Sequence, residues 1–272
     1  MIASIAQISP FFGDINRNIK KHLTYIELAK QGKAELVIFP EMSLTGYYLK
    51  DLTPEIAIDL SLKILDPLLD ASSNIDIVVS FPEKGRDFNL YISSAYLSKG
   101  KILSIHRKVY PPINGMFDDL KDYKSGDTIE SFQANNINTG MLICRDMWHP
   151  EAITELAMKD VKLIIVPSAV PLRSISENGP NIKSFINRSV VFYAEHYSLY
   201  FVFTNRVGFE EGICFYGGST VANPSGEIIL SMSLLTEEIK FFEINEREIE
   251  RRVSILPLQF EQRKNIGRYK NE

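Results

Sequence analysis

Several apolar runs in this chain are as long as one β-strand, and they constrain the fold more than any other feature. Leu36–Phe39 and Met141–Ile143 are unbroken, and Ile75–Phe81 and Leu199–Asn205 are nearly so. A half-exposed strand alternates apolar and polar residues, whereas unbroken apolar strands are typical of a sheet buried on both faces. The runs are too short to cross a membrane as helices. The sequence therefore predicts sheets that are covered by helices.

Helical patterns lie between these strands. Asp14 can cap a helix that runs to about Gln31, with Ile15, Ile19, Leu23 and Ile26 on one stripe. Proline at the first helical turn indicates other helix starts, because proline needs no hydrogen-bond donor there. The remaining expected helices cover residues 53–69, 150–158, 180–196 and 246–252.

Three pairs of strands read as hairpins. They cover residues 90–98 with 101–106, 128–133 with 137–143, and 215–222 with 227–231. Strands that alternate with both helices and hairpins favour a mixed sheet, or two sheets, enclosed by helices. No linker or internal repeat interrupts the chain, so we expect one domain over residues 1–272. The apolar side chains of the tail, residues 253–272, should pack on the domain or on a partner subunit.

Composition excludes several classes of function. The chain has 272 residues and a net charge of −4, with no basic cluster that would favour nucleic acid. No segment predicts a membrane span, and the N-terminus resembles a strand more than a signal peptide. We therefore expect a cytoplasmic protein with neither nucleic acid nor membrane as a partner. Cys144 and Cys214 are expected to stay unpaired, and no pair of residues has zinc-ligand spacing.

Reactive side chains stand at the ends of three predicted strands. Glu41 follows the strand Leu36–Pro40, Lys108 follows Ile102–Arg107, and Cys144 follows Ile137–Ile143. Reactive groups gather at strand ends in layered α/β proteins. A carboxylate, an ammonium and a thiol form a coherent set: the carboxylate takes the thiol proton, the ammonium stabilises an oxyanion, and the sulfur attacks a carbonyl or nitrile carbon.

Each of these side chains also has an ordinary structural explanation. Glu41 could cap a turn, Lys108 could be a solvated charge, and Cys144 could be a small buried apolar residue. The turn after Cys144 leads into a helix start, which would favour the thiolate form of the cysteine. His149 suggests a cysteine–histidine pair, but its place along the turn points it away and Glu41 already supplies a base.

Three segments together resemble the nitrilase, or carbon-nitrogen hydrolase, superfamily. They are residues 39–47 (FPEMSLTGY), 106–108 (HRK) and 142–151 (LICRDMWHPE), in that family's chain order and spacing. Further similar segments follow the lysine and the cysteine. They cover residues 114–119, Arg188, residues 194–195, 205–208, 215–221 and 223–226. The resemblance extends from Gln7 to about Glu243.

The resemblance implies a four-layer αββα sandwich that associates into homodimers or larger homo-oligomers. It implies Glu41 as general base, Lys108 as the cation that stabilises the intermediate, and Cys144 as nucleophile. The backbone N–H of Arg145 would contribute to the oxyanion hole. No metal or organic cofactor is implied.

This sequence departs from the family pattern at three positions. Many members have a second glutamate after the lysine, and Asp119, one methylene shorter, stands at that position here. Asn114 replaces a tyrosine found in related glutaminase and amidase loops. His196 replaces an asparagine and is interpreted as a structural hydrogen-bonding residue. Asp119 could orient the lysine and the substrate, or it could be only a solvated loop residue.

The expected activity is cleavage of a non-peptide carbon–nitrogen bond in a small linear amide through a cysteine thioester. The first segment, continued to Leu52, most resembles the glutaminase domain of NAD synthetases, so a free-standing glutaminase that supplies ammonia to a separate synthetase is one alternative. Transfer of the thioester to an amine is another. Expected substrate contacts besides Asp119 and Arg145 are Tyr48, Trp148 and Arg173, whose guanidinium could hold a substrate carboxylate.

Overall fold

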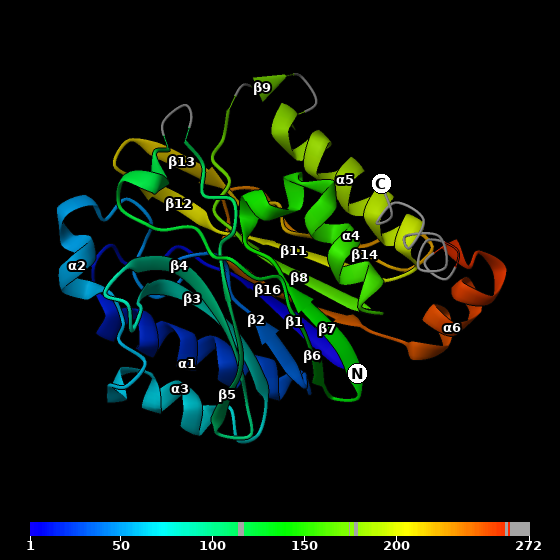
Figure 1. Ribbon diagram of the computed structural model, residues 1–272, viewed down its shortest axis with the longest axis horizontal. Helices are drawn as coiled ribbons and strands as arrows, with labels where there is room; N and C mark the ends of the chain where they lie inside the picture. Colours follow the sequence, from blue (N-terminus) through cyan, green and yellow to red (C-terminus); the bar gives the residue numbers. More distant parts are fainter. Residues whose placement is uncertain (114–116, 174, 177–178, 259–260, 262–272) are drawn as a thin grey trace, which may run out of the picture.

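The computed structural model describes residues 1–113, 117–173, 175–176, 179–258 and 261. Its centre consists of two six-stranded mixed sheets (Figure 1). The first has the spatial order β16 (Glu238–Glu243), β1 (Ile2–Gln7), β2 (Leu36–Ile38), β3 (Asp76–Lys84), β4 (Leu90–Ser98) and β5 (Lys101–Arg107). The second has the order β15 (Ile228–Ser231), β14 (Thr220–Ala222), β11 (Tyr200–Asn205), β8 (Leu163–Ser168), β7 (Ile137–Met141) and β6 (Ser131–Ala134).

The two sheets repeat one arrangement. In the first, β1, β2 and β3 are parallel, whereas β4 and β5 continue antiparallel from β3. In the second, β7, β8 and β11 are parallel, whereas β14 and β15 continue antiparallel from β11. Parallel neighbours need a crossover that covers a face of the sheet, and antiparallel neighbours need only a turn. The mixture of helices and hairpins in the sequence therefore produces both kinds of connection.

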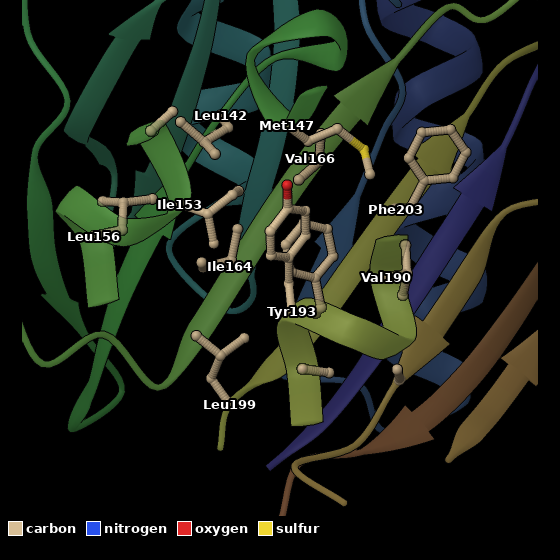
Figure 2. Close-up of a cluster of buried hydrophobic side chains, with 14 of the residues drawn as sticks. Leu142, Met147, Ile153, Leu156, Ile164, Val166, Val190, Tyr193, Leu199 and Phe203 are labelled. Atoms are coloured by element: carbon tan, nitrogen blue, oxygen red, sulfur yellow. The ribbon is translucent and has the colours of Figure 1, made fainter. Parts of the chain in front are cut away.

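Helices cover the outer faces of both sheets. On the first sheet, α1 (Ile15–Gln31) and α3 (Asp66–Ala71) contribute Ile26 and Leu68 to a cluster with Val37 and Val79. On the second, the cluster drawn in Figure 2 packs Ile153 and Leu156 of α4 (Pro150–Met158) and Val190 and Tyr193 of α5 (Asn181–Tyr197) against Ile164, Val166 and Phe203.

A separate apolar cluster lies between the two sheets. Ile5 and Ile38 of the first sheet share it with Ile165 and Val202 of the second, so the next residues along each strand face the outer helices. Each central strand is therefore buried on both faces, which explains its unbroken apolar sequence. The αββα sandwich expected from the sequence is confirmed.

Two predicted elements are wrong. The helix expected over residues 53–69 is divided into α2 (Thr53–Ile56) and α3, because Ile58 bridges to Glu83 on β3 and draws the chain into an extended conformation. The strand expected over residues 215–222 is also divided. Gly217 and Gly218 adopt positive φ angles and separate β13 (Ile213–Tyr216), which pairs with β12 (Val207–Glu210), from β14.

The C-terminal helix α6 (Glu246–Ile255) contains the start of the expected tail. Val253 packs against the cluster between the sheets, whereas Ile255 is exposed. The tail beyond residue 258, except residue 261, lies outside the described residues, so its packing stays a prediction. A two-residue pair, β9 (Ile175–Ser176) with β10 (Gly179–Pro180), precedes α5. Over the described chain, no helix combines the length and apolar character needed to cross a bilayer.

Candidate active site

The three side chains predicted to react lie just beyond three strands, at neighbouring ends of the two sheets. Glu41 follows β2, Lys108 is the residue after β5, and Cys144 begins a 3₁₀ turn shortly after β7. The side chains of Glu41 and Lys108 are buried, with Lys108 Nζ 2.7 Å from Glu41 Oε1. Cys144 is partly buried and lines the same cavity as Lys108. The fold therefore brings the carboxylate, the ammonium and the thiol together.

Lys108 donates to three oxygens. Besides Glu41, its ammonium contacts Asp119 Oδ2 and the hydroxyl of Tyr47, each at 3.2 Å. The Tyr47 hydroxyl in turn donates to Asp119 Oδ2 at 2.6 Å. Asp119 is buried, so it is not merely a solvated loop residue. Three oxygens around one ammonium hold Lys108 in a single position.

Negative charge exceeds positive charge around Lys108, because the carboxylates of Glu41 and Asp119 share its one ammonium. Burial raises the pKa of Glu41 above its ordinary 4.5, Lys108 opposes this shift, and Asp119 adds to it. Burial works against the charge on Lys108, but the carboxylates of Glu41 and Asp119 outweigh it and raise the pKa of the lysine. Glu41 Oε2 has no hydrogen-bond partner among the described residues. Glu41 thus combines a raised proton affinity with an available oxygen.

The backbone conformation of Cys144 is unusual, and its thiol differs from the thiolate that the sequence predicted. Its φ angle is +46°, a conformation uncommon for residues other than glycine and often found at functional sites. Burial raises the pKa of the thiol, Glu41 adds to this, and Lys108 opposes it. The expectation that the turn favours thiolate is therefore wrong, because burial outweighs any contribution of the short 3₁₀ turn. The thiol is protonated at rest and needs a base.

Asp146 fixes the turn that carries Cys144. Its Oδ2 accepts from the backbone N–H of Ile143 at 2.9 Å and contacts His106 Nε2 at 2.8 Å. Its Oδ1 accepts from the backbone N–H groups of Val109 and Tyr110, at 3.1 and 2.9 Å. One carboxylate thus joins the residues before the nucleophile to those after Lys108. The sequence reasoning missed this role, although Asp146 stands in the cysteine segment.

A cavity of about 350 Å³ opens onto Cys144 and Lys108. Its walls are mainly apolar, with two guanidinium groups. The lining residues are Tyr47, Lys108, Pro112, Phe117, Cys144, Arg145, Trp148, Ala169, Val170, Pro171, Arg173 and Ile182. An apolar cavity with a few convergent polar groups is the usual form of a small-molecule site.

The expected substrate contacts are only partly in this cavity. Arg145, Trp148 and Arg173 line it, and Arg173 lies 5.8 Å from the ring centre of Phe117. Tyr48 does not line it, because its ring packs against Phe117 from a neighbouring hollow. Asp119 lines that hollow too and reaches the site only through Lys108 and Tyr47. Asn114 lies outside the described residues.

His149 is not among the residues that line the cavity. Its ring stacks on Tyr110 with the ring centres 3.7 Å apart, and its Nδ1 lies 3.3 Å from Glu151. Cys144 and Cys214 are both unpaired. Over the described residues, no group of three or more histidine, cysteine, aspartate or glutamate side chains is arranged to hold a metal ion.

Sequence reasoning did not assign a role to Tyr47, Phe117 or the pair Arg206–Glu210. Tyr47 stands in the first family-like segment, and its position beside Gly46 was the available signal. Arg206 and Glu210 form a buried ion pair behind the Tyr47 loop, with 2.8 Å between Arg206 Nη1 and Glu210 Oε2. No local pattern indicates that this pair lies beside Tyr47, because the bonds from the Tyr47 and Tyr48 backbone to Glu210 join residues more than 160 positions apart.

Comparison with known proteins adds independent evidence. The carbon-nitrogen hydrolase family model matches residues 2–252. A glutamine-dependent NAD(+) synthetase of Thermotoga maritima is 30% identical over 239 residues, which are 87% of this chain but 40% of that protein. A nitrilase of Pyrococcus abyssi is 26% identical over 247 residues, covering 88% of this chain and 87% of the nitrilase. The chain therefore spans less than half of its synthetase relatives but most of the nitrilase.

Solved structures agree on the fold. A carbon-nitrogen hydrolase of Helicobacter pylori has a TM-score of 0.85 at 23% identity, covering 97% of this chain and 96% of that one. A glutamine-dependent NAD+ synthetase of Acinetobacter baumannii has a TM-score of 0.82 at 27% identity, covering 91% of this chain and 46% of that one. The strand-end site, the αββα fold and the family model over nearly the whole sequence lead to one conclusion: the chain belongs to the carbon-nitrogen hydrolase family.

Proposed function

We propose that this protein hydrolyses the carbon–nitrogen bond of a small linear amide, with Cys144 as nucleophile, Glu41 as general acid and base, and Lys108 as the cation that stabilises the oxyanion. The proposal rests on the difference between the hydrogen-bond partners of the two Glu41 carboxylate oxygens. Oε1 accepts from Lys108, whereas Oε2 has no partner among the described residues. A base must keep one oxygen available for the proton it removes.

The first half of the reaction forms a thioester. Glu41 takes the thiol proton while the sulfur of Cys144 bonds to the amide carbon, and the carbonyl electron pair moves to the oxygen. The ammonium of Lys108 and the backbone N–H of Arg145 stabilise that oxyanion. Protonated Glu41 then gives its proton to the nitrogen, the carbon–nitrogen bond breaks, and ammonia or an amine leaves.

The second half returns the enzyme to its starting state. Glu41 removes a proton from water, whose oxygen bonds to the thioester carbon and forms a second oxyanion. This intermediate collapses, the carbon–sulfur bond breaks, and Glu41 returns the proton to Cys144. The product is a carboxylic acid. Because the pKa of Glu41 is raised by burial, the same carboxyl group can both accept and donate a proton.

Asp119 acts in this proposal as the counterpart of the family's second glutamate. Its shorter side chain reaches Lys108 at 3.2 Å and is supported by the hydroxyl of Tyr47. The two carboxylates keep Lys108 charged at all physiological pH values, which an oxyanion-stabilising group requires.

The cavity supports a small substrate that carries a negative charge. A volume of about 350 Å³ suits a molecule of modest size, and Arg145 and Arg173 place two guanidinium groups in mainly apolar walls. A guanidinium binds a carboxylate through paired hydrogen bonds. An amide with a carboxylate at its other end, such as glutamine or another ω-amide, fits this pattern better than a neutral aliphatic amide.

Glutaminase action that supplies ammonia to a separate synthetase is the second candidate. It is favoured by the likeness to part of the Thermotoga maritima NAD(+) synthetase, of which this chain covers 40%. On its own, this activity would appear as ammonia release that is strongest with glutamine among the ω-amides.

Ammonia release from a panel of substrates tests the proposal. The panel contains glutamine, other ω-amides, carbamoyl compounds, aliphatic amides and nitriles. Cys144→Ala should abolish turnover, and Cys214→Ala is the matched control because it removes the other free cysteine, which does not line the cavity. Full activity in Cys144→Ala would contradict the mechanism.

Product analysis separates hydrolysis from transfer. With an amide and a primary amine supplied together, hydrolysis yields only the acid, whereas an N-acyltransferase yields the new amide. Intact-protein mass spectrometry should detect an acyl group on Cys144 in both cases. If the new amide is the main product at modest amine concentration, the hydrolase assignment is wrong although the thioester step stands.

A further inference from the structure

A buried ion pair lies behind the loop that carries Tyr47. Arg206 follows β11 and Glu210 ends β12, and both side chains are buried, with Arg206 Nη1 2.8 Å from Glu210 Oε2. The Arg206 guanidinium also lies over the Phe215 ring, 4.2 Å from its centre. A buried ion pair seldom adds much stability over apolar residues of the same size, because removing both charges from water is costly. Stability alone therefore does not account for this pair.

The other oxygen of Glu210 binds the backbone beside the site. Oε1 accepts from the N–H groups of Tyr47 and Tyr48, at 2.7 and 2.6 Å. Both oxygens of the carboxylate are thus in use, one on Arg206 and one on this loop. Charge-assisted hydrogen bonds of this length are among the stronger contacts in proteins. Glu210 therefore connects the β12–β13 hairpin to the loop that follows β2.

Gly46 leaves the space that this carboxylate occupies. Its φ angle is +82°, and a Cβ atom at this position would lie 2.7 Å from Glu210 Oε2 and 3.3 Å from the Cα of Phe12. A side chain would therefore both strain the backbone and push Glu210 away from the loop. The close approach of the carboxylate and the glycine beside Tyr47 are parts of one arrangement.

Tyr47 connects this arrangement to the chemistry. Its hydroxyl accepts from Lys108 at 3.2 Å and donates to Asp119 at 2.6 Å, and its side chain lines the cavity. The backbone anchor at Glu210 and the hydroxyl contacts lie at opposite ends of the same residue. A shift of the backbone would move the hydroxyl and change the position of the Lys108 ammonium.

We infer that Glu210, held by Arg206, is a positioning residue for catalysis: its carboxylate oxygen anchors the Tyr47 backbone so that the Tyr47 hydroxyl holds Lys108 where the oxyanion forms. This inference rests on the proposed function. Displacement of a stabilising group by a fraction of an ångström weakens the transition state more than the bound substrate. Loss of the anchor should therefore lower kcat and leave KM nearly unchanged.

Two double variants separate the anchor from the charge. Arg206→Met with Glu210→Gln removes both charges but keeps an oxygen that can accept from Tyr47 and Tyr48. Arg206→Met with Glu210→Leu removes both charges and the acceptor. Neither leaves an unpaired buried charge, but the leucine variant leaves the N–H groups of Tyr47 and Tyr48 without their acceptor, so it should melt at a lower temperature. The kinetic constants are therefore compared at a temperature where both double variants are folded. We expect kcat of the leucine variant to be about tenfold below that of the glutamine variant, with KM within about twofold.

The same two double variants, made in a Tyr47→Phe background, test whether Glu210 acts through the Tyr47 hydroxyl. If Glu210 acts through the Tyr47 hydroxyl, the tenfold difference in kcat should shrink to less than about twofold once that hydroxyl is absent. A purely structural role would leave the difference unchanged. Equal kcat of the two double variants with Tyr47 present, or an undiminished difference in Tyr47→Phe, would overturn the inference.

Gly46→Ala provides a second route if a double variant does not fold. It leaves Arg206 and Glu210 in place but crowds the carboxylate, so kcat should fall while KM stays within about twofold. An unchanged kcat in folded Gly46→Ala would also overturn the inference. Failure of the proposed function is distinct: it would appear as wild-type turnover that does not depend on Cys144. Turnover that depends on Cys144 keeps the proposed function standing even when the positioning role fails.

Discussion

Glu41 and Asp146 are two fully buried carboxylates next to the same reactive groups, yet their oxygens are used in different ways. Asp146 contacts three backbone N–H groups and the ring of His106. Glu41 accepts from Lys108 through Oε1, and its Oε2 has no hydrogen-bond partner among the described residues. Burial is equal, so the number of donors distinguishes the two groups.

This difference separates a group that holds structure from one that can react. Both oxygens of Asp146 already accept backbone hydrogen bonds, which fix this carboxylate in place and suit a structural role. A buried carboxylate with one available oxygen is costly in its charged form, and the pKa of Glu41 is raised accordingly. Glu210 resembles Asp146 in this respect, because both of its oxygens are occupied.

The largest expected effect is that of Glu41→Gln. The amide oxygen can still accept from Lys108, but glutamine cannot take the thiol proton, so kcat should fall about 1,000-fold. The free energy of unfolding should change by less than about 1.5 kcal/mol, because Lys108 keeps Asp119 as a partner. Steady-state kinetics and urea unfolding measure the two quantities. Turnover within tenfold of wild type would remove Glu41 from the role of base.

Asp146→Asn should show the opposite pattern, with stability as the main loss. An amide nitrogen in place of one oxygen faces a backbone N–H and leaves it unpaired, so unfolding should become easier by about 3 kcal/mol. Urea unfolding measures this, and Asp51→Asn on the exposed surface is the matched control, with less than about 0.5 kcal/mol expected. Unchanged stability together with a large loss of kcat would show that Asp146, like Glu41, acts mainly in the reaction and not in holding the structure.

Asp119→Asn should change the pH dependence of turnover. The negative charge of Asp119 raises the pKa of Glu41, and turnover needs Glu41 as a carboxylate, so activity falls as pH drops through that pKa. Asparagine removes the charge, lowers the pKa of Glu41 and should move the acidic limb of kcat/KM to lower pH. Loss of one charge-assisted hydrogen bond should also reduce kcat about tenfold. A shift of the limb to higher pH would contradict this electrostatic assignment.

His22→Gln should have the smallest effect and extends the comparison to a buried base. Both ring nitrogens are in use, Nδ1 at 2.7 Å from the Asn18 carbonyl oxygen and Nε2 at 3.0 Å from Ser43 Oγ, and burial lowers the pKa from 6.5 to about 3. Between these values the unfolded chain binds a proton that the folded chain does not. Wild-type stability should therefore fall by about 1.4 kcal/mol per pH unit below 6.5 from this group.

The variant should lack this contribution, so its free energy of unfolding should depend less steeply on pH between 6 and 4. Urea unfolding at several pH values measures the slope. Turnover should change little, because His22 touches Ser43 and not the cavity. An identical slope in both proteins would show that His22 is not the group that titrates.

Much of the fold could be predicted because its determinants are local. Residues close together in the sequence determine the apolar strand Leu36–Ile38 and the apolar stripe of α1. The same is true of the end of β5 before Lys108. The missed division at Ile58 has a different origin, since the bridge to Glu83 joins residues that no local pattern relates. The spacing of apolar residues indicates whether a segment is a helix or a strand and which face is buried. It does not indicate which distant strand the segment will contact.

The sequence by itself determined which chemical groups stand at the strand ends, because an apolar run and the polar residues after it locate the end of a strand. Only the tertiary structure decided how Glu41 is partnered, that Tyr48 lines a neighbouring hollow and not the cavity, and that Glu210 binds the backbone of Tyr47. The pKa of Cys144 also depended on packing, since burial raises it where its place in the chain suggested the reverse. The identity of a residue is local, whereas its partners and its desolvation come from parts of the chain that meet only on folding.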